Sequence, residues 1–600
     1  MVKVGAGTLT LSGANTYTGG TVLKEGRIDV GHDSALGTGT LAMDDGTTLG
    51  FAANKLTLSN AIYMTGSKDP VIDTGRFDAT LAGAITGAGF LTKVGAGTLT
   101  LSGANSYTGA TNVAEGTLRA GAAYTFSPAS AMSVASGATL DLAGHSQTLQ
   151  SLTNAGTVSL VGSAPGTVLT VTGPWVGNGG TLALGVALSG NDTQTDRLVL
   201  DGSAAVASGS TLVRLTNLAG LGGQTTGNGI AIVTTQNGAS IQDGAFSLSG
   251  TVSAGAYDYH LATKDGGAYL SSILSAAAAT PVPTYRAEAP LLAAAPEQLR
   301  EAGLAMVGNL HQRVGDEVRN GTTGSQRQAW GRYISVDRDI AQEGTVSPTS
   351  SGRQSGVQVG TDLWGNPNWR AGIYVGQLEG ELDVTGFSRG TQNYAAGSND
   401  LRSQFLGGYA TWRNDGGTYV DTVLQGGRLR YTAHPVAAAS TEGKGSSVLA
   451  SVEVGQALQV APGWVLEPQL QLASQHLDLD DLSLAGATVR QHNDSTWLAR
   501  IGVRVKGEVA TGAGLLQPYA RVNVYRRSSG TDTARFIGPA ATTDILSSKG
   551  GTSTELAVGA TWQVRPLVAA YGEVGRLWAN TGAARTDGSV GGSLGLRVQW

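Results

Sequence analysis

The sequence contains no cysteine, although it is 600 residues long. Disulfide bonds, thiolate nucleophiles and cysteine-ligated metals are therefore excluded. In an exported protein this absence suits a chain that crosses a pore unfolded, because a disulfide would obstruct its passage. The seven histidines are scattered and none pairs at helical ligand spacing, so we expect neither a metal site nor a cofactor.

Charge is also scarce, at 14% of residues with a net charge of −5. A chain with this net charge has no excess of positive charge to attract nucleic acid, so we exclude nucleic acid as a partner. No apolar run approaches the roughly 18 residues of a membrane-spanning helix. A membrane β-barrel stays open as an alternative, because its strands give a much weaker sequence signal. The first residues lack the basic and apolar segments of a signal peptide. The chain is thus either cytosolic or the C-terminal piece of something longer, and we favour the second.

Glycine, by contrast, is abundant, and one glycine-rich segment occurs twice. Lys3–Val30 and Lys93–Ala120 share 19 identical residues in 28 positions. Short alternating strands lie between Gly/Asn turns, and each is too small to bury its own apolar face. Stacked coils of roughly 20 residues would share one core. Residues 1–185 therefore predict a parallel β-helix, and a β-sandwich with similar strand spacing is the alternative.

The repeated motif G-x-G-T-L-T-L-S-G-x-N-x-Y-x-G is similar to the passenger-associated repeat of bacterial autotransporters, where it belongs to the stalk of an exported passenger. We expect the asparagines to lie in the bends and to bond the backbone of neighbouring turns. The structural positions of the two copies are Gly5, Gly7, Leu9, Leu11, Gly13, Asn15 and Tyr17, and then Gly95, Gly97, Leu99, Leu101, Gly103, Asn105 and Tyr107.

Residues 186–274 resemble the C-terminal cap of pertactin-like passengers, in which D-x-L-x-L-x-G leads to G-x-Y-x-Y-x-L. A solenoid with an open end exposes strand edges, so a cap is physically required. The resemblance implies that this autochaperone region folds first outside the cell and templates the stalk. The matching residues are Asp196, Leu198, Leu200, Gly202, Gly255, Tyr257, Tyr259 and Leu261.

An Ala/Pro-rich segment, residues 275–295, indicates a linker, and residues 296–320 then indicate a helix. Pro296 suits a first helical position. At ~1.5 Å per residue the helix would be roughly 36 Å long, enough to cross a membrane. Its charges forbid lipid contact. It either threads a polar lumen or packs as an amphipathic helix on a soluble domain. Its expected apolar face is Leu299, Gly303, Met306, Leu310, Val314 and Val318.

Residues 321–600 hold nine of the ten tryptophans and alternate between apolar and polar side chains. Polar faces carry large hydrogen-bonding groups, which favours an antiparallel transmembrane β-barrel with a wet lumen. Residues 385–400 would be a surface loop. The twelve expected strands are 328–338, 352–363, 369–384, 401–413, 417–433, 445–459, 464–477, 496–509, 514–527, 554–565, 567–580 and 588–600.

The last strand places Leu594, Leu596, Val598 and Trp600 on one outward face. It resembles the terminal signal read by the outer-membrane assembly machinery, in which phenylalanine is commoner than tryptophan. Repeat, cap, helix and barrel follow the order of classical monomeric autotransporters. The resemblance favours the threaded helix and implies an all-β protein of the bacterial outer membrane, with its passenger on the cell surface or released.

That resemblance also implies the function and the partners. The barrel would translocate and anchor its own passenger, an adhesin or virulence-associated surface protein. The implied partners are outer-membrane lipid, the barrel assembly machinery, periplasmic chaperones and a host or cell-surface ligand. One autotransporter group cleaves its linker at an Asn-Asn pair. This chain has Asn309-Leu310 and Asn320-Gly321 instead, so that reaction is not carried over.

No catalytic constellation is expected in this chain. Gly591–Gly595 matches G-x-S-x-G but lies in a strand without the following helix that the motif requires. His32, Asp33 and Ser34 are adjacent, and adjacent residues rarely form a triad. Two alternatives stay open. One is an enzymatic head upstream of Met1, such as a subtilisin-like serine protease, and the other is a soluble β-solenoid fused to a β-domain.

Overall fold

A computed structural model describes residues 1–66, 70–188, 195–218, 220, 222–274, 281–317, 327–538 and 541–600. The chain divides into two compact units. The solenoid unit comprises Met1–Ala254 and Asp258–Pro281, and the barrel unit comprises Gly255–Tyr257 and Val282–Trp600. Among the described residues, no helix is both long and apolar enough to cross a membrane.

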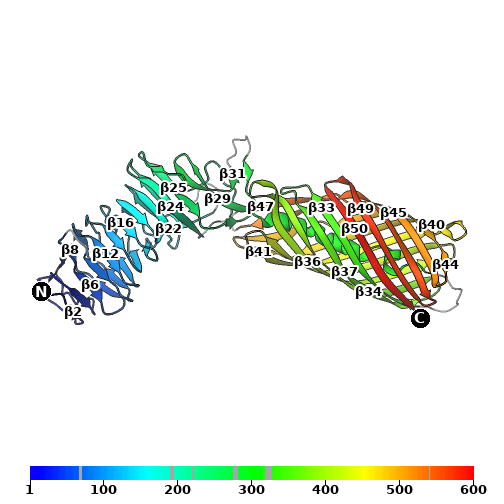
Figure 1. Cartoon of the computed structure of the whole chain (residues 1–600), viewed down its shortest axis with the longest axis horizontal. Coiled ribbons are helices and arrows are strands. Elements are labelled where there is room, and N and C mark those ends of the chain that lie inside the picture. Colours follow the sequence, from blue (N-terminus) through cyan, green and yellow to red (C-terminus); the bar gives the residue numbers. More distant parts are fainter. Residues whose placement is uncertain are drawn as a thin grey trace. The chain divides into compact units, whose positions relative to one another are not determined.

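Most of the solenoid unit is a ladder of short strands paired in parallel between successive coils (Figure 1), and only its last strands, around β30, pair antiparallel. One stack contains β1 (Val2–Lys3), β3 (Thr21–Leu23), β5 (Leu41–Met43), β8 (Ile62–Met64) and β11 (Ile85–Gly87). The large sheet contains β2 (Thr8–Leu11), β4 (Arg27–Val30), β6 (Thr48–Phe51), β7 (Leu56–Leu58), β9 (Val71–Asp73), β10 (Ala79–Leu81), β12 (Leu91–Val94), β13 (Thr98–Leu101), β14 (Thr111–Val113), β15 (Thr117–Ala120), β16 (Ala131–Val134), β17 (Thr139–Asp141), β19 (Ser151–Asn154), β20 (Thr157–Ser159), β22 (Trp175–Val186), β24 (Val206–Asn217), β26 (Ser240–Ile241) and β27 (Phe246–Leu248). The C-terminal stack contains β18 (Gln147–Leu149), β21 (Val168–Val171), β23 (Arg197–Asp201), β25 (Ile230–Gln236), β28 (Val252–Ala254), β29 (Tyr257–Lys264) and β30 (Gly267–Ser271).

The register places equivalent side chains of successive coils on top of one another. Leu99 pairs with Leu118, Leu118 with Leu140, and Leu140 with Val158, and all four are fully buried. Each coil thus adds one apolar layer to a common core that no single coil could form alone. The parallel ladder confirms the predicted β-helix and excludes the β-sandwich.

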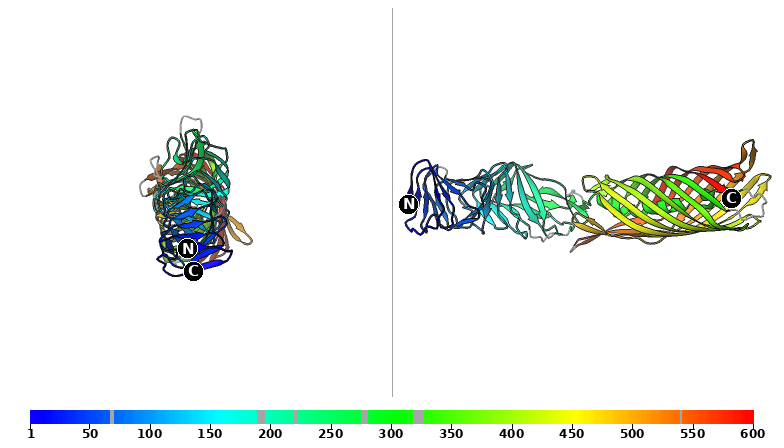
Figure 2. Two further views of the ribbon diagram at one scale, coloured as in Figure 1. Left: turned by 90° about the vertical axis from the view of Figure 1, so that its left-hand side faces the viewer. Right: turned by 90° about the horizontal axis from the view of Figure 1, so that it is seen from below.

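The barrel unit contains twelve long antiparallel strands that close on themselves, because β33 pairs with β50 and β38 pairs with β40. The strands are strongly tilted (Figure 2). In ring order they are β33 (Gln328–Gln342), β34 (Thr349–Gly365), β35 (Trp369–Ser388), β36 (Thr391–Arg413), β37 (Thr418–Pro435), β38 (Thr441–Gln456), β40 (Trp464–Leu479), β43 (Thr496–Gly507), β45 (Gly514–Arg527), β48 (Gly551–Arg565), β49 (Val568–Gly582) and β50 (Ala584–Gln599). The predicted number of strands is confirmed.

Several strands extend beyond the lengths expected from the sequence. The surface loop predicted for residues 385–400 is wrong, because β35 and β36 stay paired up to Ser388 and Thr391. A second, unpredicted sheet contains β41 (Leu482–Leu484), β42 (Ala487–His492), β46 (Gly530–Ile537) and β47 (Thr542–Lys549). The short strands β39 (Leu458–Ala461) and β44 (Val509–Thr511) lengthen two hairpins of the ring.

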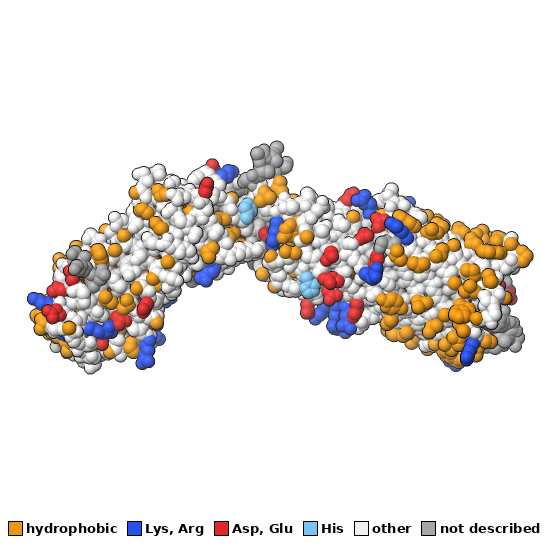
Figure 3. Space-filling model, in the orientation of Figure 1, with side chains coloured by type: hydrophobic (Ala, Val, Ile, Leu, Met, Phe, Trp, Pro, Cys, Tyr) orange, Lys and Arg blue, Asp and Glu red, His pale blue; other side chains and the backbone are white. Residues whose placement is uncertain are grey.

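The barrel wall is polar inside and apolar outside. In β40, Glu467, Gln469 and Gln471 are buried, whereas Leu470 and Leu472 are exposed. Apolar side chains dominate the C-terminal end of the barrel surface in Figure 3, and charged side chains gather over its middle. This is the alternation expected of a wall between lipid and a filled polar lumen.

Candidate functional site: the helix inside the barrel

Helix α1 (Glu288–Val307) lies inside the barrel and is buried along nearly its whole length. The predicted helix start at Pro296, and a linker that continues to residue 295, are therefore wrong. Pro296 has no N–H to donate to Leu292, but Gln491 Nε2 donates to that carbonyl at 3.1 Å. Because the wall supplies the missing bond, the helix continues through the proline. Residues 318–320 of the predicted helix lie outside the described residues.

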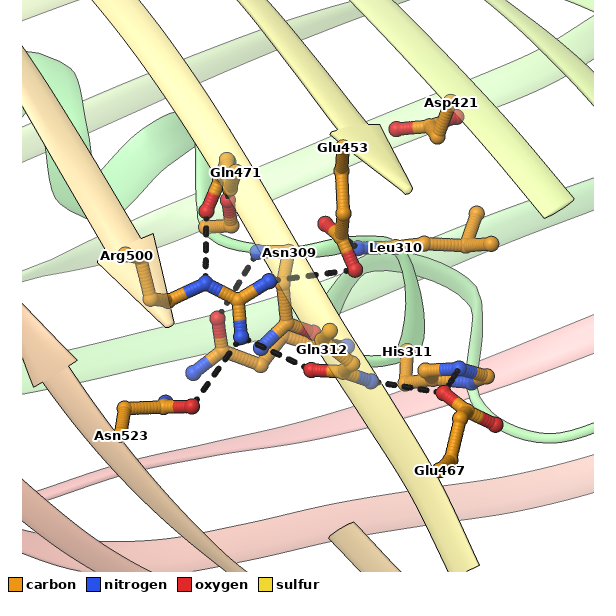
Figure 4. Close-up of polar contacts among 12 residues, drawn as sticks. Asn309, Leu310, His311, Gln312, Asp421, Glu453, Glu467, Gln471, Arg500 and Asn523 are labelled. Atoms are coloured by element: carbon orange, nitrogen blue, oxygen red, sulfur yellow. Dashed lines mark hydrogen bonds and ion pairs between the residues drawn. The ribbon is translucent and has the colours of Figure 1, made fainter. Parts of the chain in front are cut away.

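The helix is also interrupted, at Gly308, where the chain adopts a φ of +56°. A second helix, α2 (Leu310–Val314), starts with a capping box in which Asn309 Oδ1 accepts from the Gln312 N–H at 2.8 Å (Figure 4). Arg332 donates to the carbonyl of Met306 at 2.7 Å, so the wall also satisfies the last turn of α1. The Asn309 side chain is thus engaged in the cap.

Charged residues of α1 are paired with charged residues of the barrel. Arg300 forms a bidentate pair with Asp532 of β46, at 2.5 and 2.7 Å. Arg527 of β45 contacts Glu297 at 3.1 Å and also contacts Glu301. These side chains are almost entirely withdrawn from solvent, and a buried charge without a partner would be strongly destabilising.

A second group of pairs surrounds α2, towards the other end of the lumen. Arg313 contacts both carboxylate oxygens of Asp421 at 2.8 Å. His311 contacts Glu467 at 2.7 Å, as Figure 4 shows. The Leu310 N–H donates to Glu453 at 3.0 Å. Together with the pairs of α1, these contacts hold the chain at one position in the lumen, because a shift by one turn would separate all of them.

The repeated motif adopts the same structure in both copies. The Asn105 side chain accepts from the Ile85 N–H at 2.7 Å and donates to the carbonyl of Thr125 at 2.6 Å, which ties three coils together. Asn15 donates to the carbonyl of Ala35 at 2.7 Å. Gly95 has a φ of +82° and lies directly against the backbone of Gly75, where a side chain would collide. Tyr107 is fully buried among these coils.

The predicted cap residues fall in both units. Asp196 is buried and accepts hydrogen bonds from the N–H groups of Gly166, Thr167 and Gly185, at 2.9, 2.9 and 2.6 Å. Burial raises its pKa despite these donors. Leu198 is buried in the solenoid, and Tyr259 donates to the carbonyl of Gly223 at 2.6 Å.

Tyr257 belongs to the barrel unit rather than to the cap core. Its ring stacks on Tyr285 with centroids 5.4 Å apart. Two residues earlier, the Gly255 N–H donates to the carbonyl of Gly486, between β41 and β42. The short segment Gly255–Tyr257 is therefore packed on the barrel's additional sheet.

In the final strand, Leu594, Leu596, Val598 and Trp600 are all exposed, at 68, 62, 45 and 53%. Arg597 faces inward and donates to the carbonyl of Val314 at 2.8 Å. Trp600 exchanges two backbone hydrogen bonds with Arg327, at 3.0 and 3.1 Å. The four side chains form an apolar row on the outer wall, and their role in assembly stays a prediction.

Comparison with known families gives three matches along the chain. Residues 1–30 and 91–120 match the passenger-associated transport repeat, residues 147–261 match autochaperone domain type 1, and residues 329–575 match the autotransporter β-domain. The chain is an autotransporter. Its barrel lies in the bacterial outer membrane and its passenger is on the cell surface.

Curated autotransporters match over large parts of the chain. The Adhesin BmaC autotransporter of Brucella suis is 29% identical over all of this chain and 18% of its own length. The probable autotransporter YfaL of Escherichia coli is 26% identical over all of this chain and 47% of its own length. The Pertactin autotransporter of Bordetella bronchiseptica is 27% identical over 46% of this chain and 30% of its own length. The chain thus spans less than half the length of each of these relatives.

The lumenal partners of the helices were missed in the sequence. Asp421, Glu453, Glu467, Arg504 and Asp532 are all buried and face the helices or their surroundings. Each occupies an inward position of a strand, and a charged residue at such a position is a signal that could have been used. The alternation predicted the wall, but nothing local indicates which wall charge meets which helix charge.

Proposed function

We propose that this autotransporter barrel exports its own β-helical passenger and then anchors it at the cell surface. The observation that carries this proposal is the set of ion pairs between α1, α2 and the barrel wall. Those pairs require both the helix and the wall to be in place. They therefore retain the chain in the lumen once export has ended, and the passenger stays attached through the N-terminal end of α1.

We further propose that the passenger is an adhesin rather than an enzyme. One relative of this chain is named an adhesin, and the solenoid presents a long polar surface of the kind that contacts other molecules. The residues with a superficial catalytic pattern are structural. Gly591–Gly595 lies within β50, His32 Nδ1 accepts from the Ser34 N–H, and Asp33 accepts from the Thr57 N–H.

The proposal includes partners during assembly. Periplasmic chaperones would hold the unfolded chain, and the barrel assembly machinery would read the exposed row that ends at Trp600. Deleting Trp600 should leave little barrel in the outer membrane, whereas Trp600→Phe should behave like the parent, and both should refold in detergent. Normal insertion of the deletion variant would contradict this role.

The adhesive function is tested by expressing the full chain in a non-adherent bacterium. Attachment to host cells or matrix-coated surfaces is then counted beside passenger exposure, measured by protease added to intact cells. We expect adherence to rise only when the passenger is exposed. Exposed passenger with no gain in adherence to any surface would contradict the adhesin proposal but not the anchoring proposal.

A further inference from the structure

The outer wall of the barrel carries a basic row across three neighbouring strands. Arg402 of β36 lies directly opposite Arg430 of β37, and Arg430 lies directly opposite Lys444 of β38. All three side chains point outward and are exposed. Like charges on directly opposite strand positions repel one another. A fold that places three of them side by side therefore keeps an unfavourable arrangement that an anionic partner would relieve.

Several exposed arginines of the barrel unit have a carboxylate partner. Arg353 pairs with Asp337 at 2.5 Å, Arg490 with Asp481 at 3.2 Å, and Arg535 with Asp544 at 2.7 Å. Arg402 pairs with Glu379 at 2.9 Å. Within the described part of the chain, Arg428, Arg430 and Lys444 make no ion pair. These three cations without a carboxylate thus lie on two neighbouring strands, β37 and β38.

The basic row lies beside the apolar surface of the barrel. Leu406 pairs with Gly426, which pairs with Val448, and these two apolar side chains are 61 and 55% exposed. Arg428 is two residues further along β37 and Arg430 is four. At ~3.3 Å per residue, Arg428 lies roughly 7 Å and Arg430 roughly 13 Å along the strand from the last apolar row. Because the strand is tilted, their heights above that row along the membrane normal are smaller. Long basic side chains bridge such a distance to the headgroup region.

The basic row lies near the end of the barrel that faces the cell exterior. Asn399 lies three residues before Arg402 on β36. Its side chain donates to the carbonyl of Leu291, which is near the start of α1. The passenger precedes α1 and is on the cell surface, so this end of the barrel meets the outer leaflet. Beyond the basic row, Asp400, Thr432 and Glu442 line the same shallow hollow as Arg402, Arg430 and Lys444.

We infer that this hollow binds the phosphorylated sugar headgroup of an outer-leaflet lipid. Arg430 and Lys444 in the hollow, together with Arg428 between the hollow and the apolar surface, neutralise its phosphate groups. The acyl chains continue onto the apolar surface at Leu406 and Val448. Asp400 and Glu442, farther from the membrane, accept hydrogen bonds from sugar hydroxyls. The order along the strands, apolar then basic then acidic, matches the order of groups in such a lipid from its tails outward.

The test uses the full chain refolded in detergent and titrated with phosphorylated lipid A, with bound lipid counted by native mass spectrometry. The test variant carries Arg428→Gln, Arg430→Gln and Lys444→Gln. The control carries Arg353→Gln, Arg490→Gln and Arg535→Gln, which removes the same charge from other exposed sites of the barrel unit. We expect roughly 10- to 100-fold weaker binding for the test variant and less than roughly 3-fold for the control. Dephosphorylated lipid A should bind the parent as weakly as the phosphorylated lipid binds the test variant.

Equal binding by the test variant and the parent would overturn the inference, as would equal losses in test and control variants or equal binding of dephosphorylated lipid. Folding of each variant is checked by its heat-dependent shift on a gel. Arg430→Gln alone removes the central like charge and should fold at least as well as the parent. It should still weaken lipid binding severalfold, and an unchanged affinity of this folded variant would also overturn the inference.

Discussion

The solenoid and the barrel are both built from strands that alternate apolar and polar side chains. The apolar side chains point inward in the solenoid and outward in the barrel. In the solenoid, Leu99 and Leu118 face a dry core and their threonine neighbours face water. In the barrel, Leu470 and Leu472 face outward, and Glu467 and Gln471 face the lumen. Alternation alone therefore specifies a two-faced strand, and the solvent on each side decides which face holds the fold together.

The inversion changes what a buried charge does. The solenoid core is mainly apolar, and its stability comes chiefly from shape complementarity and buried area. The barrel lumen is filled by helices whose charges, such as Arg300 and Arg313, meet charges on the wall. Such pairs contribute little net stability over an apolar core, but they are costly to break. They therefore select one position of the helix rather than merely filling the lumen.

The largest effect is expected from breaking one lumenal pair. Asp421→Leu leaves Arg313 buried without its carboxylate, which should cost about 3–5 kcal/mol, whereas the double variant Arg313→Leu with Asp421→Leu should recover most of that loss. The measurement is the temperature at which the detergent-solubilised barrel loses its fast-migrating folded form on a gel. A double variant no more stable than the single one would show that the pair does more than avoid an unpaired charge.

The same new side chain should act differently on the outside of the two regions. Ile501 of β43 is 66% exposed on the barrel and Thr10 of β2 is exposed on the solenoid. Ile501→Arg should destabilise the barrel in lipid vesicles by about 2–4 kcal/mol, and Thr10→Arg should change solenoid stability by less than about 0.5 kcal/mol. Urea titration of the full chain in vesicles measures the first and protease resistance the second. A harmless Ile501→Arg would place this surface in water.

A smaller effect is expected at a polar group inside the solenoid. Lys93 is fully buried and its Nζ donates to the carbonyls of Val94, Gly95 and Glu115, at 3.0, 2.7 and 3.1 Å. Lys93→Met leaves these carbonyls unsatisfied and should cost about 1–3 kcal/mol. Lys3 makes the equivalent bonds at an exposed site, so Lys3→Met is the control and should cost less. Amide hydrogen exchange around each lysine gives both values, and equal costs would contradict the role of burial.

The same lysine makes solenoid stability depend on pH. Burial lowers the pKa of Lys93 from 10.5 to about 8, so the unfolded chain retains this proton up to higher pH than the folded one. Stability should therefore rise between pH 8 and 10.5, by about 1–2 kcal/mol after allowance for solvent screening. Lys93→Met should lack this rise. Identical pH profiles for the parent and the variant, measured by hydrogen exchange, would show that Lys93 does not contribute.

The wall could be predicted from sequence because each strand carries its own two-residue period. The coils could be predicted because the motif at Lys3 recurs at Lys93. The start of α1 could not, because Ala/Pro-rich residues favour a linker, and only the distant side chain of Gln491 satisfies the carbonyl that Pro296 leaves free. The break at Gly308 did leave a local signal, since Asn309 and Gln312 have the spacing of a capping box.

The long hairpin of β35 and β36 was missed for a related reason. Residues 385–400 are rich in Gly, Asn and Ser, which favours a loop. Pairing with β37, as between Asn399 and Ala433, and the bond from Asn399 to α1 keep these residues extended. Tertiary contacts thus decide the conformation wherever local composition is neutral.

The central claim is that α1 lies within the barrel and thereby keeps the passenger attached to it. Because the chain has no cysteine, two introduced cysteines report on one contact alone. A side chain at Gly303 would meet Gln475 on the inner face of β40, whereas the next residue, Ser474, is exposed on the outer face. Gly303→Cys combined with Gln475→Cys should cross-link with a short bismaleimide in intact outer membranes and shift the mobility of the denatured chain. Gly303→Cys combined with Ser474→Cys should not. Cross-linking of the second pair, or of neither, would contradict a helix inside the barrel.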